Sequence, residues 1–406
     1  MARISSKTND APETKIKLLF LIHTLQVGGA EKALVNLVNH LDKSRFDITV
    51  MTIVDTGAFR RDLPKSVHYK TIFKLPHKND SIKPKKSGNL FDGKSNLKAV
   101  LAKFYSYLWR HINLDKFYIH HITEKYDLEI AFLEGISAKI IAHSNNVESK
   151  KIAWIHVDLL NERKSEQFFK NLSDECKTYS AFDKIIAVSQ TTKEHFIKKF
   201  NFDPKKVVVK YNIIDENKIK VLAQTNPTVT HDFTICTVGR LSWQKGYDRL
   251  LRVIKRLNNN KLRFTVWIIG VGAEEGKLRE YITKNKLANV KLLGYKSNPY
   301  PYINAADLYV CSSRAEGYST TIAEALVLRT PIVTTDCSGM RELLGNSRYG
   351  LICENSEDAL YYALEKVIKN HDYYQKLRHQ IFRRQDNFNS ETAAQSIEKI
   401  FQESLL

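Results

Sequence analysis

The stretch Ile16-Lys17-Leu18-Leu19-Phe20-Leu21-Ile22 decides the fold, because a mostly apolar run of this length is typical of one buried strand. It is followed by Val27-Gly28-Gly29-Ala30 and then by an amphipathic segment from Glu31 to Leu41. A buried strand, a glycine turn and a helix form the unit from which helix-covered parallel sheets are built. The sequence therefore predicts an α/β fold.

The same alternation recurs along the chain in two series. Apolar runs of strand length are separated by helical segments, as expected for two doubly wound, Rossmann-like parallel sheets. The first series continues at Phe46–Val54, Asp127–Leu133, Lys151–His156 and Lys184–Val188, and the second comprises Phe233–Val238, Phe264–Ile269, Val290–Leu293, Asp307–Val310 and Pro331–Thr335.

The chain length and the position of the two series predict two domains. A chain of 406 residues, of which 43% are hydrophobic, is too long for one ordinary core. We predict an N-terminal domain over residues 1–212, a C-terminal domain over 213–385, and a last helix within 386–406 that packs back across the junction. Ligands of such sheets bind at the carboxyl ends of the strands, so the cleft between the domains is the expected site.

The formal charge of +19 limits the classes of partner. Polyphosphate ligands, anionic membranes and nucleic acid all attract such a surface. No zinc-finger spacing, RNA-binding aromatic signature or basic heptad region occurs, so we expect no nucleic-acid partner. The five cysteines include no Cys-x-x-Cys pair, the opening segment is polar, and no apolar run is longer than a strand. These features indicate a cytoplasmic protein that is either soluble or peripheral to a membrane.

One basic segment, residues 74–125, interrupts the alternation. It holds eleven Lys or Arg against four Asp or Glu, and its middle, Leu97–Arg110, is rich in aromatic residues. Basic amphipathic helices with Trp and Tyr lie on anionic membranes, which is one interpretation. The other is a helix packed on its own sheet with solvated lysines.

Two glutamates flank a polar turn at Glu316-Gly317-Tyr318-Ser319-Thr320-Thr321-Ile322-Ala323-Glu324. The turn leads into an apolar helix, so the amides of its first residues are unpaired donors at a helix N-terminus. Acceptors for hydroxyl groups on both sides of an anion-binding terminus suit a nucleotide sugar. A capped helix with two exposed acids is the other interpretation.

A second anion-binding loop follows the first strand of the second series. Gly239, Arg240 and Lys245 lie between this strand and the helical segment Tyr247–Leu257. A strand end, a glycine turn, two cations and a helix N-terminus form a grip for a diphosphate. Two solvated basic side chains in a loop are the alternative.

Other candidate residues also follow strands. Gly28 and Gly29 permit the close approach of a phosphate or sugar to the backbone, and Gly270 with Gly272 forms a similar turn. Neither pair completes Gly-x-Gly-x-x-Gly, so a dinucleotide is not indicated. His156 ends a strand from which it can contact a sugar hydroxyl, and the backbone at Gly294-Tyr295 can border a nucleobase, although each of these features also fits an ordinary loop.

Taken together, these residues resemble the retaining glycosyltransferases of family 4. The resemblance implies the GT-B architecture, in which two facing Rossmann-like domains enclose a deep cleft, and it leaves out the stretch from about Lys74 to Lys125. The matching pieces come in family order: Val27-Gly28-Gly29-Ala30-Glu31, His156, Ala187-Val188-Ser189, Tyr211-Asn212, Gly239-Arg240 with Lys245-Gly246, Gly270-Val271-Gly272, Gly294-Tyr295, and Glu316-Gly317 with Glu324-Ala325.

The resemblance also implies a role for each charged residue. Arg240 and Lys245 would bind the donor diphosphate and stabilise it as the leaving group, without a metal or other cofactor. Glu324 would accept hydrogen bonds from the ribose, and Glu316 would hold hydroxyls of the donor sugar. His156 would touch that sugar from the opposite domain.

Backbone amides complete the implied donor site. Gly29 would bring its amide to the phosphate, and the amides of Tyr318, Ser319, Thr320 and Thr321 would assist on the sugar and phosphate. The chain departs from the family pattern at Tyr318-Ser319-Thr320, where an apolar turn is frequent, and at Asn212-Ile213-Ile214-Asp215, where many members carry Asn-Gly-Val-Asp. Both departures concern the assignment of the donor rather than the class of reaction.

The expected activity is retaining transfer of a hexose or N-acetylhexosamine, from a donor expected to be a UDP-sugar, to a saccharide acceptor. The acceptor is expected to be lipid-linked and to serve capsular or exopolysaccharide synthesis at the cytosolic membrane face. The alternatives are a sugar-nucleotide epimerase or hydrolase on the same fold, and a non-enzymatic nucleotide-sugar binder.

Overall fold

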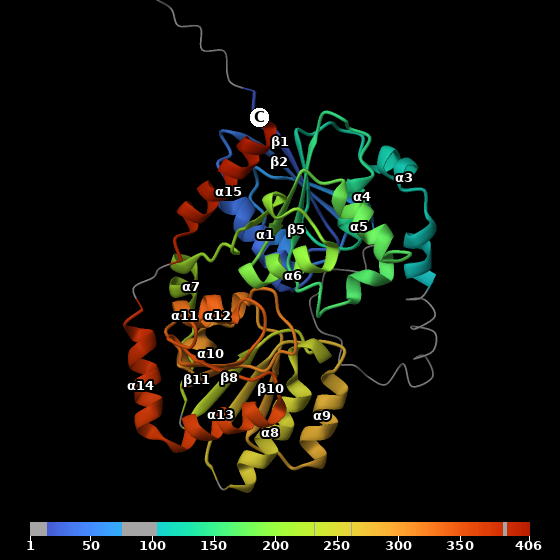
Figure 1. Cartoon of the computed structure of the whole chain (residues 1–406). Coiled ribbons are helices and arrows are strands. Elements are labelled where there is room, and N and C mark those ends of the chain that lie inside the picture. The colour runs from blue at the N-terminus through green and yellow to red at the C-terminus, as the bar shows by residue number, and fades with distance from the viewer. Residues whose placement is uncertain (1–13, 75–103, 231, 261, 385–387) are drawn as a thin grey trace, which may run out of the picture.

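The computed structural model of the chain describes residues 14–74, 104–230, 232–260, 262–384 and 388–406. It contains two parallel sheets, each covered by helices, and one lies above the other in Figure 1. Every pairing of neighbouring strands within these sheets is parallel. The α/β class and the two doubly wound sheets expected from the sequence are confirmed.

The N-terminal sheet has seven strands in the order β3-β2-β1-β4-β5-β6-β7. Its strands are β1 Ile16–Ile22, β2 Phe46–Val54, β3 His68–Phe73, β4 Leu128–Ala131, β5 Lys150–Ile155, β6 Lys184–Ala187 and β7 Val207–Val209. The helical elements of this half are α1 Gly29–His40, η1 Ala58–Asp62, α3 Leu114–His121, α4 Ile136–Ala142, η2 Lys164–Phe168, α5 Leu172–Ser180, α6 Gln190–Phe200 and η3 Pro204–Lys206.

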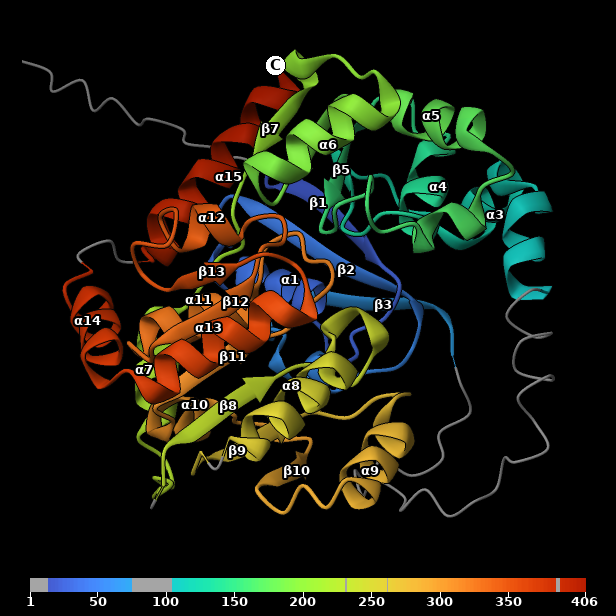
Figure 2. The ribbon, with the colours of Figure 1, turned by 60° about the horizontal axis from the view of Figure 1, so that its bottom comes forward.

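The C-terminal sheet has six strands in the order β10-β9-β8-β11-β12-β13, and α8 and α13 lie side by side on one of its faces (Figure 2). Its strands are β8 Thr234–Val238, β9 Thr265–Ile269, β10 Val290–Gly294, β11 Leu308–Cys311, β12 Ile332–Thr335 and β13 Leu351–Cys353. The helical elements from residue 216 onward are α7 Glu216–Ala223, η4 Trp243–Lys245, α8 Tyr247–Asn259, α9 Glu275–Lys284, α10 Tyr300–Ala305, α11 Thr320–Val327, α12 Met340–Leu343, α13 Glu357–Lys369, α14 His371–Phe382 and α15 Ser390–Leu405.

The central strand β1 shows why its sequence is almost continuously apolar. Leu18, Phe20 and Ile22 are fully buried in the cluster on one face of the sheet, whereas Leu19 and Leu21 are fully buried in the cluster on the other. A strand with helices on both faces has no polar side, so it lacks the alternation of a half-buried strand.

Three strands have no counterpart in the sequence prediction, and all three lie at sheet edges. β3, β7 and β13 each have one pairing partner. β3 is nowhere fully buried, and β7 and β13 are only three residues long. Edge strands are covered less completely than central ones, so they do not require a long apolar run that a sequence pattern would reveal.

The last helix, α15, returns to the N-terminal sheet (Figure 1). Phe401 is fully buried, and its ring lies 6.1 Å from that of Phe20 and 6.2 Å from that of Phe46. The Glu398 carboxylate accepts a hydrogen bond of 2.7 Å from the backbone amide of Asp42. The helix that follows the C-terminal domain is therefore part of the core of the other domain.

The basic segment is described only in part, because residues 75–103 lie outside the described ranges. Residues 104–111 are helical and are followed by α3. Trp109 is buried against the N-terminal sheet, whereas Phe104, Tyr107 and Leu108 are exposed. This helix thus packs on its own sheet through Trp109 and Tyr105 and presents other apolar side chains to the surroundings.

None of the helices in the described ranges is both long enough and apolar enough to cross a bilayer.

We expect Phe401→Ala to lower the stability of the N-terminal domain by about 3 to 5 kcal/mol, because it leaves a cavity between the rings of Phe20 and Phe46. Urea unfolding followed by tryptophan fluorescence measures the loss. The matched control is Gln395→Ala on the exposed side of α15. Equal midpoints for the two variants would contradict the packing role of α15.

Candidate functional site

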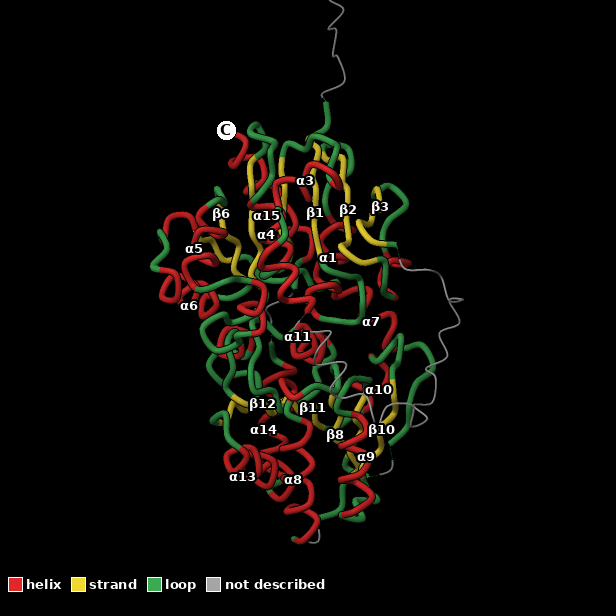
Figure 3. Tube along the Cα trace, turned by 90° about the vertical axis from the view of Figure 1, so that its right-hand side faces the viewer, coloured by secondary structure: helices red, strands yellow, loops and turns green. Residues whose placement is uncertain are grey.

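The helices α1 and α11 meet at the junction of the two sheets, and α11 lies between the sheets in Figure 3. Helix α1 begins at Gly29 after an N-cap glycine, Gly28, that offers no side-chain cap. A Cβ atom on Gly29 would lie 3.6 Å from Oγ1 of Thr320, the first residue of α11. Two helix N-termini therefore face one space, and both attract anions.

The turn before α11 is ordered by its own hydroxyl groups. The Ser319 hydroxyl caps α11 by accepting a bond of 3.4 Å from the Ile322 amide, and it lies 3.2 Å from the Thr321 hydroxyl. Ser319 and Thr320 are buried. The structure therefore brings Gly28, Gly29, Ser319, Thr320 and Thr321 together, as the sequence analysis expected of a donor site.

Arg240 and Lys245 reach this space from the loop after β8. A Cβ on Gly28 would lie 3.0 Å from Nη2 of Arg240, so the guanidinium extends across to the opposite domain. The Lys245 ammonium donates a bond of 2.6 Å to Oε1 of Glu316, which also accepts 2.5 Å from the Ser313 hydroxyl. Burial opposes the charge of Lys245, but the Glu316 carboxylate outweighs it and raises the pKa of Lys245.

The carboxylate of Glu324 is paired with a lysine that was not predicted from the sequence. Lys32 of α1 forms an ion pair with Glu324 of α11 and donates a hydrogen bond of 2.7 Å to the Tyr300 hydroxyl. Glu324 is buried, so this pair links the domains inside the cleft. Spacing along α1 gives no sign of the contact, because it depends on how the second domain docks.

The backbone of His156 is packed against the loop between Glu316 and α11. A Cβ on Gly317 would lie 2.1 Å from the carbonyl oxygen of His156, a distance that no side chain permits. The ring of His156 lies 4.8 Å from that of Phe132, and its Nε2 is buried without a hydrogen-bond partner among the described residues. Burial lowers the pKa of His156 to about 3, so the imidazole is neutral.

Glu134 is a second residue that the sequence analysis missed. It follows β4, and its Oε2 accepts a hydrogen bond of 3.1 Å from the His156 amide. Burial raises the pKa of Glu134 to about 7, with smaller contributions from the negative charges of Glu31 and Glu162. The only available signal was a Glu-Gly step at a strand end, which resembles Glu316-Gly317.

The remaining predicted donor residues lie toward the β9–β10 side. A Cβ on Gly272 would lie 2.3 Å from the carbonyl oxygen of Leu241, and one on Gly270 1.9 Å from that of Gly239. These glycines therefore allow the loops after β8 and β9 to pack together. Tyr295 follows β10 and is half-buried.

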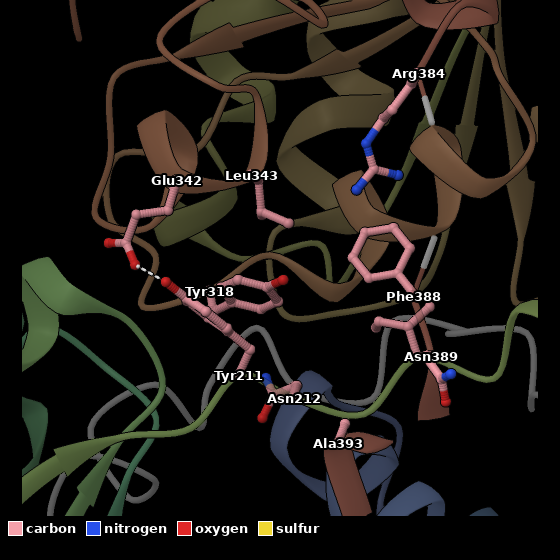
Figure 4. Close-up of a pocket in the computed structure, with 10 residues that line it drawn as sticks. Tyr211, Asn212, Tyr318, Glu342, Leu343, Arg384, Phe388, Asn389 and Ala393 are labelled. Carbon is pink, nitrogen blue, oxygen red and sulfur yellow. Dashed lines mark hydrogen bonds between the residues drawn. The ribbon is translucent and has the colours of Figure 1, made fainter. Parts of the chain in front are cut away.

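Tyr318 differs from its neighbours because its side chain leaves the donor space. Its ring lies 5.2 Å from that of Tyr211 and lines a cavity of about 300 Å³ at the linker between the domains (Figure 4). The Tyr211 hydroxyl donates a bond of 2.9 Å to Glu342, which also accepts 2.8 Å from the Gln190 amide. Of Tyr318, only the backbone therefore belongs to the predicted donor site.

Two sequence profiles match the chain and meet within α7. The profile described as Glycosyltransferase Family 4 matches residues 27–218, and the one described as Glycosyl transferases group 1 matches residues 219–384.

Among curated proteins, a relative from Campylobacter jejuni is 26% identical over 87% of this chain and 90% of its own length. It is named N-acetylgalactosamine-N,N'-diacetylbacillosaminyl-diphospho-undecaprenol 4-alpha-N-acetylgalactosaminyltransferase. An uncharacterized glycosyltransferase from Haemophilus influenzae is 23% identical over 87% of this chain and 91% of its own. The capsular polysaccharide biosynthesis glycosyltransferase CapM of Staphylococcus aureus is 24% identical over 46% and 50%.

Solved structures share the fold over nearly the whole chain. Anabaena HepE in complex with UDP-glucose is 21% identical, with a TM-score of 0.64 over 96% of this chain and 100% of its own. The sucrose-phosphate synthase of Thermosynechococcus elongatus is 15% identical, with a TM-score of 0.69 over 96% and 99%. With the two sheets described above, these likenesses confirm the expected GT-B fold.

We expect Gly317→Ala to hold the domains apart, because the added methyl group would overlap the His156 carbonyl oxygen. Small-angle scattering should show a larger radius of gyration. The matched control is Gly276→Ala, where a Cβ meets nothing within 4 Å. Identical scattering from the two variants would contradict the contact.

We expect Glu134→Gln to raise the melting temperature at pH 8 and to leave it unchanged at pH 4.5. The Glu134 carboxyl keeps its proton up to about pH 7 when folded but loses it near pH 4.5 when unfolded, so the wild type loses stability across this window. The amide avoids this cost, which is about 1 to 3 kcal/mol at pH 8. Calorimetry at the two pH values measures the effect, and an equal gain at both would contradict it.

Proposed function

Because this chain belongs to the glycosyltransferases of family 4 and group 1, we propose that it moves a sugar from a nucleotide-diphosphate donor to a saccharide acceptor, with retention of configuration. The observation that carries the proposal is the meeting of two helix N-termini with Arg240 and Lys245 in one interdomain space. Such a space binds an anionic diphosphate more favourably than it binds a neutral group.

The proposed donor is a UDP-sugar carrying a hexose or N-acetylhexosamine. Anabaena HepE, which shares the fold, was solved in complex with UDP and with UDP-glucose. The strand order supports one direction for the donor: the base near Tyr295 after β10, the diphosphate at Arg240 after β8, and the sugar at Glu316 after β11.

Arg240 and Lys245 are proposed to supply most of the rate enhancement. Negative charge builds up on the diphosphate as the glycosidic bond breaks, and cations already in place stabilise that charge without reorganisation. The diphosphate that leaves then takes the proton of the acceptor hydroxyl on the same face. We propose that no metal ion takes part, because the two side chains provide the positive charge.

The carboxylates that pair with cations in this structure are proposed to turn to the donor when it binds. The ribose hydroxyls would replace Lys32 as the donors to Glu324, and the sugar hydroxyls would share Glu316 with Lys245. Lys32 would then lie beside the nucleotide as a further cation. The neutral ring of His156 would contact the sugar from the N-terminal domain.

We propose that the acceptor is lipid-linked and that the enzyme works at the cytosolic face of a membrane, in synthesis of capsular or other cell-surface polysaccharide. The relative from Campylobacter jejuni is named for a diphospho-undecaprenol acceptor, and CapM for capsule biosynthesis. The exposed apolar side chains of residues 104–111 support membrane contact. Five lysines of the basic segment that we propose to contact the membrane, Lys83, Lys85, Lys86, Lys98 and Lys103, lie outside the described residues.

We expect Arg240→Ala to lower kcat about 100- to 1,000-fold, as does the removal of one oxyanion donor in other enzymes. The donor is identified first by thermal shift, since a ligand at a hundred times its Kd stabilises by about 2.7 kcal/mol. The matched control is Arg263→Ala, at an exposed position before β9. Unchanged transfer by Arg240→Ala would refute the mechanism, and conversion of the donor without any acceptor would favour an epimerase or hydrolase.

A further inference from the structure

A second cavity, of about 460 Å³, opens between the domains beyond the proposed sugar position. Its N-terminal wall is formed by Asp158, Asn161, Thr191 and His195. The volume is within the range of small-molecule sites, of about 300 to 1,000 Å³. None of these residues has a role in donor binding as proposed above.

The strand order places this cavity next to the donor sugar. The proposed donor follows the strand ends from β10 through β8 to β11, and the next strands in the sheet are β12 and β13. The loops after β12 and β13 form the second wall, through Ser338 and Asn355. Ala315, the residue before Glu316, also lines the cavity, so a molecule inside it adjoins the sugar.

The lining is polar and its charges are balanced. Arg314 donates hydrogen bonds of 2.7 and 2.8 Å to Asp248, and Arg341 forms an ion pair of 2.5 Å with Asp336. Each guanidinium is thus paired with a carboxylate, which leaves no excess positive charge for a phosphate. Hydroxyl, amide and imidazole groups around a balanced space suit a neutral polyol.

His195 is held in one orientation and one tautomer. Its Nδ1 lies 2.8 Å from Oδ2 of Asp158, so Nδ1 carries a proton and donates it in a hydrogen bond to the carboxylate; in the neutral imidazole Nε2 is then an acceptor. Asp158 also accepts 2.7 Å from the Ser338 hydroxyl and 2.8 Å from the Asn161 amide group. Burial opposes the ionisation of Asp158, but these bonds outweigh it and lower its pKa.

We propose that this cavity binds the acceptor sugar, a neutral hexose or N-acetylhexosamine, and that Nε2 of His195 accepts a hydrogen bond from one of its hydroxyls. The inference rests on the proposed function and adds the position and chemistry of the acceptor. Asp158 is a positioning residue, because it acts through His195. Since Asp158 and Ser338 belong to different domains, the acceptor site is complete only when the domains are closed.

The test fills the cavity without touching the donor site. Thr191→Trp, with Lys198→Trp on the exposed side of α6 as the matched control, is assayed with the UDP-sugar found by thermal shift. We expect Thr191→Trp to retain donor binding and donor hydrolysis within twofold. Saturation-transfer NMR with UDP and a panel of free neutral hexose and N-acetylhexosamine disaccharides should show contact with the wild type and the control, and none with Thr191→Trp.

The role of His195 is tested by measuring KM and kcat separately for transfer to the saccharide that shows contact. We expect His195→Ala and Asp158→Asn to raise the KM for this acceptor about tenfold or more, with donor hydrolysis unchanged. His195→Gln, whose amide oxygen can accept the same bond, should recover part of the loss. A structural role alone would not separate the acceptor KM from donor hydrolysis.

Two results would overturn the inference. In the first, no disaccharide of the panel contacts the wild type in the presence of UDP. In the second, Thr191→Trp and His195→Ala have the same KM for the acceptor as the wild type. Failure of the proposed function is a different result, in which Arg240→Ala leaves transfer intact.

Discussion

The close packing of Gly317 on the backbone of His156 is the contact on which the site depends. A side chain at Gly317 would place its Cβ 2.1 Å from the His156 carbonyl oxygen, so only a residue without Cβ allows the domains to meet here. Because they meet, the N-terminus of α11 faces that of α1, and Arg240 reaches Gly28. The anion-binding space is therefore made by docking and belongs to neither domain alone.

Charges inside the cleft are paired across and within the domains. Lys32 binds Glu324 across the junction, and Lys245 binds Glu316 within the C-terminal domain. A buried charge without a partner would be costly, so each proposed donor-binding carboxylate already holds a cation. Binding of an anionic, hydroxylated ligand would exchange these partners rather than create charges, which limits the cost of opening and filling the site.

Most of the candidate donor site could be predicted from sequence motifs. Arg240, Lys245, Glu316 and Glu324 each stand next to a glycine turn or a helix start, and such positions leave a mark in the sequence. Lys32 and Glu134 also stand next to a helix start and a glycine, but these marks give no sign of their contacts, and Asp158 and His195 stand in segments without such marks. Their partners are distant in sequence, and some lie in the opposite domain.

By itself, the sequence determined the fold class, the two parallel sheets and the strand ends that carry the cations, because burial on both faces of a central strand requires a continuous apolar run. The tertiary structure alone decided the edge strands, the contacts of Phe401 in α15 with Phe20 and Phe46, and the linker position of the Tyr318 ring. It also decided the partners of Glu316 and Glu324 and the cavity around His195. These features arise where two separately patterned units pack together, and a pattern along one chain does not record the contacts between them.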